Sequence, residues 1–271
     1  MDTTNNSKTN EKFKANPYNK NNKLIEEKDI INIMKSLNIN DFKVNDIKLY
    51  QTSFIHKSYC KLKDYEEYDN IHNYLELQDN SYETMEFLGD SILEKEVCSY
   101  LYKRFYLIHN KNEGFLTKLK IRIVCGENLY ELSKKLKFQQ FLIISDHIEN
   151  NCNGRDNLNI LEDVFEAFIG ALYLDQSIEL VEKFIISVIE LYIDFTDILL
   201  RDNNYKDQII RYCQQNFNNH PKYIHEKLDN NQYKCKLYLN DKLICEDFGI
   251  SKKKSEQNVS KKSLIKFNVL T

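Results

Sequence analysis

Three acidic residues are spaced so that one face of a helix would carry all of them. Glu83, Glu86 and Asp90 stand at positions i, i+3 and i+7 within the segment YETMEFLGDSIL, residues 82–93. On a helix this spacing places the three side chains within roughly 60° of arc. Acidic side chains are rarely buried unless they are paired or bind a cation. The pattern therefore fits either a solvated stripe on an amphipathic helix or one half of a metal or catalytic site.

A second acidic pair lies in the apolar segment ILEDVFEAFIGALYLD, residues 160–175. This segment is too apolar for a surface helix, so we expect it to run through the core. Asp163 and Glu166 share one face of it, at i and i+3. Burying an uncompensated carboxylate in such a setting lowers the folding stability by several kcal/mol. Because this helix has little room for a solvated face, a purely structural reading of its two acids is harder to sustain than for the first helix.

If the two helices meet face to face, they supply four oxygen donors: Glu86, Asp90, Asp163 and Glu166. Hard oxygen ligands without His or Cys favour Mg²⁺, with Mn²⁺ as a substitute, over zinc. Two divalent ions held in this way are the common machinery for hydrolysing phosphodiester bonds. The rival di-iron helical bundle requires Glu-x-x-His pairs, and none of the six histidines has a glutamate three residues before it.

The composition indicates one large or two small helix-rich domains. The 271 residues include only six glycines and two prolines, which favours helices over many-turned β structure. No apolar run approaches the roughly 18 residues that span a membrane. The seven cysteines show no C-x-x-C spacing, so we expect reduced thiols and a cytoplasmic protein, in the host cytoplasm if the source is viral. Residues 1–25 are polar and lack a secretory h-region, and we expect them to be disordered.

The charge is unevenly distributed along the chain. Residues 204–271 hold 13 Lys/Arg against 7 Asp/Glu, whereas residues 1–203 hold 25 against 34. A basic C-terminal piece beside an acidic body suggests a polyanion-binding module joined to a carboxylate-rich one.

Apolar periodicity predicts an all-α body followed by a smaller mixed module. We expect helices at 26–38, 44–59, 81–104, 115–125, 127–136, 160–175 and 180–200, with an exposed loop or frayed helix at 61–80 and a loop at 145–159. A helix at 204–216 then precedes alternating runs at 233–239 and 243–245, joined by the turn Asn240-Asp241, and a lysine-rich helix from about 251.

Four motifs occur in order over residues 28–200: FIHKSY at 54–59, ETMEFLGDS at 83–91, EGFLTKL at 113–119 and DVFEAFIGALYLD at 163–175. Together they resemble the nuclease domain of the ribonuclease III family. The tail resembles a double-stranded RNA-binding domain, through Tyr205-Lys206, Pro221-x-Tyr223 and the segment GISKKKSEQN at 249–258. The resemblance implies a mainly α protein: an all-α nuclease domain at 26–200, then a small α+β domain of order α-β-β-β-α at 204–271.

The resemblance also implies an activity and its residues. The family's metal ligands fall on Glu86, Asp90, Asp163 and Glu166, with Asp90 and Glu166 indispensable for catalysis. Glu83 and Glu113 match positions in the cleft between two subunits. We therefore expect a homodimeric, Mg²⁺-dependent endoribonuclease that cuts double-stranded RNA and leaves 5′-phosphate and 3′-hydroxyl ends with short 3′ overhangs. The alternative is a non-cleaving protein that sequesters duplex RNA.

The expected RNA contacts lie in the C-terminal module. Lys252, Lys253 and Lys254 at a helix N-terminus combine side-chain charge with the helix dipole, which suits phosphate, and Gln214 is a candidate for a 2′-hydroxyl contact. The module departs from the family in two places: residues 228–232 replace a Gly-Pro-x-His loop, and Ile250 replaces a basic residue. We therefore expect weaker or differently placed RNA binding.

Two further residues receive structural assignments. Metal-activated water needs no imidazole, so we interpret His56 as a hydrogen-bonded structural histidine rather than a base. Glu94 follows Asp90 by one turn, where the motif requires no acid, and we expect it on the surface.

Overall fold

The computed structural model describes residues 15–200, 204–228 and 232–270. The chain divides into two compact units, with the boundary between Phe195 and Thr196. We call the first the nuclease unit and the second the C-terminal unit, and describe each by itself. The disorder expected for residues 1–14 lies outside the described residues.

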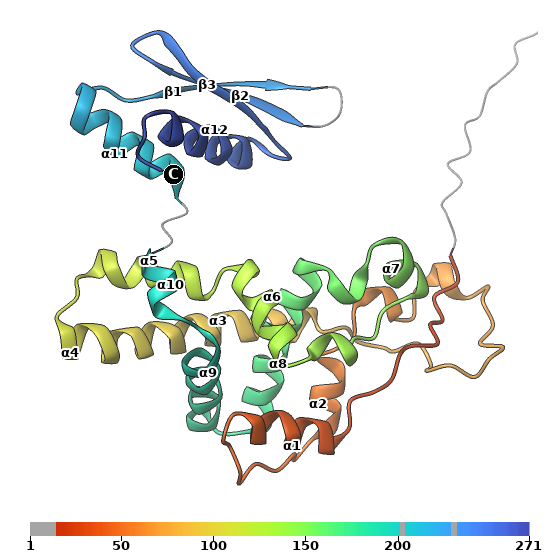
Figure 1. The fold of residues 1–271 in the computed structure, drawn as a ribbon. Coiled ribbons are helices and arrows are strands. Elements are labelled where there is room, and N and C mark those ends of the chain that lie inside the picture. Colours follow the sequence, from red (N-terminus) through yellow and green to blue (C-terminus); the bar gives the residue numbers. More distant parts are fainter. Residues whose placement is uncertain (1–14, 201–203, 229–231, 271) are drawn as a thin grey trace, which may run out of the picture. The chain divides into compact units, whose positions relative to one another are not determined.

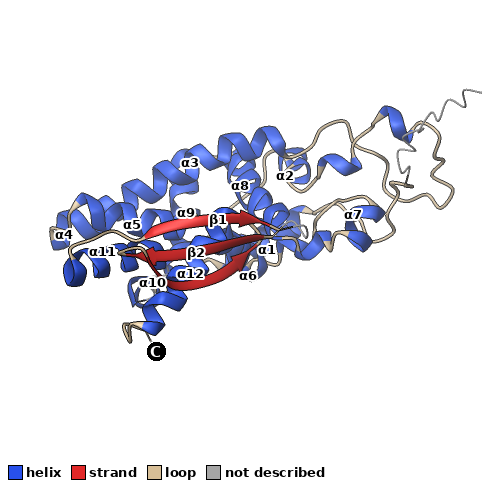
Figure 2. Ribbon diagram, turned by 90° about the horizontal axis from the view of Figure 1, so that it is seen from above, coloured by secondary structure: helices blue, strands red, loops and turns tan. Residues whose placement is uncertain are grey.

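The nuclease unit is helical, as predicted (Figure 1, Figure 2). Its α-helices are α1 (Glu27–Ser36), α2 (Ile47–Thr52), α3 (Glu83–Leu101), α4 (Leu107–His109), α5 (Glu113–Ile123), α6 (Gly126–Lys135), α7 (Asp146–Asn151), α8 (Leu158–Asp175) and α9 (Ile178–Tyr192), with α10 (Phe195–Leu200) at the boundary. Short 3₁₀ turns lie at Lys57–Tyr59, Lys63–Tyr65, Phe138–Gln140 and Gly154–Asp156, and a π-helical turn at Tyr102–Tyr106.

Helices α3 and α8 meet through their backbones because each contributes a glycine at the contact. A Cβ on Gly89 of α3 would overlap the carbonyl oxygen of Glu166 and lie 2.6 Å from its carbonyl carbon. A Cβ on Gly170 of α8 would likewise overlap the carbonyl group of Met85. Any larger residue at either position would force the two helices apart. The glycines therefore set how closely the two acidic faces approach.

The core of the nuclease unit surrounds α8. Ten consecutive or near-consecutive residues of this helix are buried, which agrees with the predicted core helix. The ring of Phe168 lies 4.9 Å from that of Phe138 and 5.5 Å from that of Phe184, measured between centroids. Aromatic pairs at such separations add to the free energy of area burial, so α8 is a rigid support for the side chains at its exposed edge.

Two expected helices and one expected loop differ in the structure. The helix expected at 44–59 ends at Thr52, because Ile55 pairs with Ile143 in a parallel bridge and His56 N donates to Ile143 O at 2.9 Å. The expected loop at 145–159 contains α7, and the helix expected at 180–200 is interrupted at Ile193, whose backbone is extended. In the first case a long-range backbone pairing overrides local helical periodicity.

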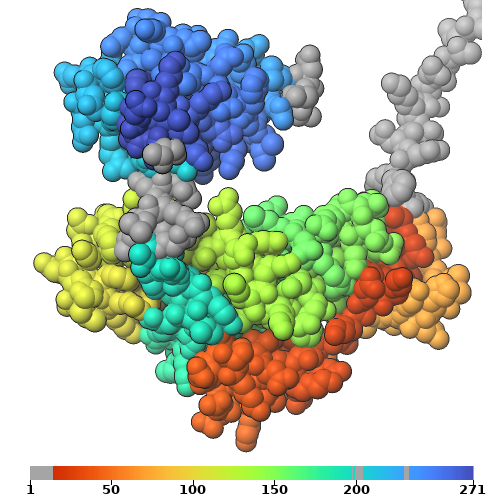
Figure 3. Space-filling view, in the orientation of Figure 1, coloured from red at the N-terminus to blue at the C-terminus, as the bar shows by residue number. Residues whose placement is uncertain are grey.

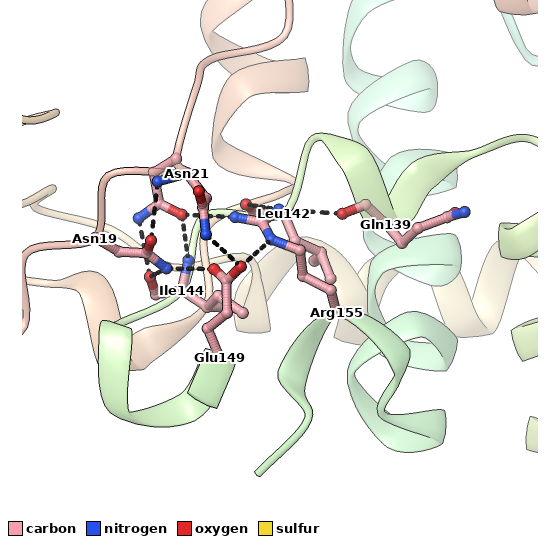
Figure 4. A network of polar contacts seen from close by, with 8 residues as sticks. Asn19, Asn21, Gln139, Leu142, Ile144, Glu149 and Arg155 are labelled. Atoms are coloured by element: carbon pink, nitrogen blue, oxygen red, sulfur yellow. Dashed lines mark hydrogen bonds and ion pairs between the residues drawn. The ribbon is translucent and has the colours of Figure 1, made fainter. Parts of the chain in front are cut away.

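Residues 15–25 of the expected disordered segment lie along the nuclease unit beside α7 (red beside green in Figure 3). Asn19 is 1% exposed, and its amide donates to Ile144 O at 3.1 Å and to Glu149. Asn21 donates to Glu149 Oε1 at 2.8 Å, and Arg155 joins the same carboxylate at 3.0 Å (Figure 4). The structure therefore differs from the expectation over this stretch, because polar composition gives no information about partners more than 100 residues away.

The C-terminal unit has the predicted order α-β-β-β-α: α11 (Tyr205–Phe217), β1 (Lys222–Lys227), β2 (Tyr233–Leu239), β3 (Lys242–Gly249) and α12 (Lys252–Lys266). The strands form an antiparallel sheet in the order β1-β2-β3, and both helices cover one of its faces (Figure 1, Figure 2). Asn240 and Asp241 have φ values of 50° and 60°, as a type I′ hairpin requires. The hairpin predicted at these two residues is confirmed.

Candidate functional site

Helices α3 and α8 place the four predicted acids around the glycine contact. Glu86 and Asp90 flank Gly89 on α3, and Asp163 and Glu166 lie on α8. Burial raises the pKa of Glu166 to about 8, with further contributions from the charges of Asp90, Glu162, Glu86 and Asp163. Burial also raises the pKa of Glu86 to about 7, followed by the charges of Asp163, Glu83 and Glu162. The carboxylates therefore lie near enough to repel one another, with Glu86, Asp163 and Glu166 half-buried and Asp90 exposed.

The carboxyl group of Asp163 has a fixed hydrogen-bond donor. The hydroxyl of Tyr82, a residue that is 2% exposed, donates to Asp163 Oδ2 at 3.0 Å. Burial raises the pKa of Asp163, and this hydrogen bond opposes the rise. Tyr82 was not predicted as a site residue. The sequence could have pointed to Tyr82 only through its position immediately before Glu83, the first acid of α3.

The acids differ in whether a cation compensates them. Within the described part of the chain, the carboxylates of Glu86, Asp90 and Glu166 make no hydrogen bond or ion pair. Glu83 instead pairs with Lys57, whose Nζ lies 3.0 Å from Oε1. Glu86 and Glu166 are half-buried, whereas Asp90 is exposed. Unpaired, half-buried negative charge is unfavourable, so Glu86 and Glu166 are suited to receiving positive charge.

The four carboxylates are chemically suitable ligands for a hard divalent cation. All the candidate ligands are carboxylates. The pKa values of Glu86 and Glu166 are raised first by burial and then by the charges of neighbouring acids. Among residues 15–200, 204–228 and 232–270, however, no three His, Cys, Asp or Glu side chains are arranged to hold one metal ion. Ion binding would require some of these side chains to rotate inward.

Glu162 is a further acid that the sequence reasoning missed. It directly precedes Asp163 on α8, and burial, together with the charges of Asp163 and Asp90, raises its pKa. Its carboxylate lies against Gly126, the first residue of α6. The sequence could have revealed Glu162 through its position four residues before Glu166, because residues at i and i+4 of a helix share one face.

The remaining predicted residues of the nuclease unit have partners other than the four acids. Glu113 is exposed in the first turn of α5 and accepts a hydrogen bond from Thr117 Oγ1 at 2.8 Å. Glu94 pairs with Lys120 at 3.0 Å, in agreement with its assignment to the surface. His56 Nδ1 lies 2.8 Å from Ser58 Oγ, and burial lowers its pKa to about 4, which agrees with a neutral, structural histidine.

The predicted RNA contacts of the C-terminal unit are exposed. Lys252, Lys253 and Lys254 form the first turn of α12, where Ser251 Oγ accepts from Lys254 N at 3.2 Å, and Gln214 is exposed on α11. Of the two departures from the family, residues 229–231 lie outside the described residues. Ile250, the other departure, is 80% exposed beside the three lysines.

Two family models match the chain in succession. A Ribonuclease-III-like model covers residues 46–191, and the Double-stranded RNA binding motif covers residues 205–266. Each match falls within one of the two units, the first in the nuclease unit and the second in the C-terminal unit.

Curated relatives agree with these matches. "Probable ribonuclease 3" of Acanthamoeba polyphaga mimivirus is 34% identical over 268 residues, which are 94% of this chain but only 45% of that protein. "Ribonuclease 3" of Enterococcus faecalis is 34% identical over 224 residues, 81% of this chain and 90% of that protein. The nuclease domain of ribonuclease III from Campylobacter jejuni matches with a TM-score of 0.48 at 25% identity, over 61% of this chain and 97% of that domain.

Proposed function

The chain belongs to the ribonuclease III family of double-stranded RNA endoribonucleases, and we propose that it cuts duplex RNA through a Mg²⁺ centre built on α3 and α8. Glu86, Asp90, Asp163 and Glu166 would hold the cation, and Mn²⁺ would substitute for Mg²⁺. The observation that carries this proposal is the close contact of the two acidic helix faces at Gly89 and Gly170, which leaves Glu166 half-buried among other acids. Burial, followed by the charges of those acids, raises the pKa of Glu166 to about 8.

The four acids would have distinct tasks. Asp90 and Glu166 are the pair that we propose as indispensable, because they come from opposite helices and flank the glycine contact. Tyr82 holds Asp163 in one orientation through its hydroxyl. When bound, divalent cations would supply the positive charge that activates water and stabilises the leaving oxygen. The products would carry 5′-phosphate and 3′-hydroxyl ends with short 3′ overhangs.

We propose that the nuclease unit forms a homodimer. One acid cluster cuts one strand, and a two-fold axis would supply a second cluster for the other strand. Large apolar side chains are exposed on α3, α4 and α5: Phe87 at 79%, Leu107 at 64%, Ile108 at 70% and Ile121 at 59%. Such exposure on neighbouring elements is typical of an interaction surface. Glu83 and Glu113 would lie in the cleft between the subunits.

The C-terminal unit would hold the duplex by its shape. The three lysines at the N-terminus of α12 would contact phosphates flanking a groove, and Gln214 would contact a 2′-hydroxyl. Lys206 is less available for RNA, because its ammonium pairs with Glu256 at 2.6 Å and lies 5.0 Å above the Tyr223 ring.

We further propose that the protein acts in the cytoplasm, in the host's if the source is viral. All seven cysteines are free thiols, which suits a reducing compartment. Within the described ranges, the helices are too short or too polar to cross a bilayer.

A cleavage assay on long duplex RNA with Mg²⁺ tests the proposal. The unmodified protein should release short duplexes, whereas Asp90→Asn and Glu166→Gln should not. Glu94→Gln is the matched control, because Glu94 lies on the same helix, is not one of the four proposed ligands and pairs with Lys120. An unmodified protein that binds the duplex without cutting it would favour the sequestering alternative, and cutting by both site variants would refute the site assignment.

A further inference from the structure

The last strand of the C-terminal unit, β3, forms one edge of the sheet. The strand order is β1-β2-β3, so among the described strands β3 pairs with β2 alone. Alternate residues of an antiparallel strand direct their backbone N–H and C=O groups to the same edge. On β3, the residues Ile244, Glu246 and Phe248 alternate in this way. A row of such groups without a partner strand is a template on which another chain can add a strand.

Three side chains of α12, which we call the edge clamp, occupy this row. Each donates a hydrogen bond to a backbone carbonyl of β3: Asn258 to Phe248 at 2.8 Å, Lys262 to Glu246 at 3.0 Å, and Lys266 to Ile244 at 2.7 Å. The donors stand four residues apart, about 6 Å along a helix, and the acceptors two residues apart, about 6.6 Å along a strand. The helix numbers rise as the strand numbers fall, so the two elements run in opposite directions and their spacings match.

The space beside β3 has room for a further strand. A hollow of about 590 Å³ lies between β3 and α12, and the two clamp lysines form part of its lining. Leu243 and Ile265, which also line it, are 43% and 44% exposed. A strand added in this place would bury these apolar side chains and would also bond to the β3 carbonyls. The edge clamp therefore occupies hydrogen-bond acceptors at an edge that is otherwise suited to strand addition.

We propose that the edge clamp prevents β3 from pairing with the β3 strand of a second copy of this chain. Two β3 edges related by a two-fold axis would form one continuous antiparallel sheet. To reach the carbonyls, the incoming strand has to displace the ammonium groups of Lys262 and Lys266. Pairing would also bring the lysines of both copies together, and like charges oppose such an approach. This role is independent of the proposed metal centre and of RNA cleavage.

The mass of the full-length protein in solution, measured by light scattering after size-exclusion chromatography, tests the edge clamp. Lys262→Met/Lys266→Met keeps most of the length of both side chains and removes both donors. We expect the mass of this variant to be about double that of the unmodified protein, reversibly and increasingly with concentration. Lys261→Met/Lys242→Met is the matched control, because it removes two charges from α12 and β3 without touching the clamp. This control, and Lys262→Arg/Lys266→Arg, which retains donors, should keep the mass of the unmodified protein.

Hydrogen exchange locates the new contact. Pairing through β3 should slow the exchange of amides in residues 242–249 and leave residues 222–227 of β1 unchanged. A methionine pair with the mass of the unmodified protein would overturn the proposal, as would slower exchange at β1 instead. Association of the control pair would also overturn it, because loss of charge alone would then be sufficient. If thermal melts show that the methionine pair does not fold, Lys266→Met alone is measured in the same way. An unchanged mass for that single variant would then count against the clamp.

Discussion

Replacing Glu166 with glutamine should stabilise the metal-free protein at alkaline pH while abolishing cleavage. The pKa of Glu166 is raised from 4.5 to about 8 by burial and by neighbouring acids. Because the folded-state pKa lies above that of the unfolded chain, ionisation of Glu166 opposes folding. The penalty is absent below pH 4.5, grows as the pH rises, and is complete above pH 8.

The structure limits the size of this effect. A rise from 4.5 to about 8, at about 1.4 kcal/mol for each pH unit, corresponds to an upper limit of about 5 kcal/mol. The side chain is only partly buried, so solvent screening reduces the expected gain to about 1–2 kcal/mol. Glutamine is uncharged at every pH, so the difference between the two proteins should be small at pH 5 and largest at pH 8.5.

Urea unfolding in EDTA, at pH 5 and at pH 8.5, measures this difference. Glu94→Gln serves as the control, because replacing a partly exposed acid that pairs with Lys120 should change the free energy of unfolding by less than about 1 kcal/mol. Adding Mg²⁺ should then stabilise the unmodified protein more than Glu166→Gln, since only the former retains the full acid set. If Glu166→Gln is no more stable than the unmodified protein at pH 8.5, the charge of Glu166 is already compensated and the argument for a cation site fails.

Three further changes test individual contacts. Gly89→Ala places a Cβ against the Glu166 carbonyl and should lower the free energy of unfolding by about 3 kcal/mol or more; a thermal melt like that of the unmodified protein would contradict the close helix contact. Tyr82→Phe removes the donor to Asp163 and should cost about 1 kcal/mol in urea unfolding while raising the Mg²⁺ requirement for cleavage. An unchanged Mg²⁺ requirement would mean that Tyr82 does not orient Asp163. Lys253→Ala should weaken duplex RNA binding and reduce the slope of log affinity against log salt by about 1, and an unaltered slope would remove Lys253 from the phosphate contacts.

Sequence alone determined the features that depend on near neighbours in the chain. Helical periodicity placed the acids on one face each of α3 and α8, because 3.6 residues per turn is a property of local backbone. The turn at Asn240-Asp241 was predictable for the same reason, since these residue types tolerate positive φ. The quartet of metal ligands stays a prediction, because it was assigned from spacing and resemblance.

Only the tertiary structure decided what lies opposite each of these faces. It brought Gly89 against Glu166, buried the acids enough to raise the pKa of Glu86 to about 7, and set Glu162 against Gly126. It also ended α2 at Thr52 through a bridge between residues 55 and 143, and tied residues 19–22 to the region around α7. These contacts join residues that are tens to more than 100 positions apart, so no local pattern encodes them. The sequence therefore determined which acids each helix presents, and the glycine contact determined how closely the two acidic faces approach.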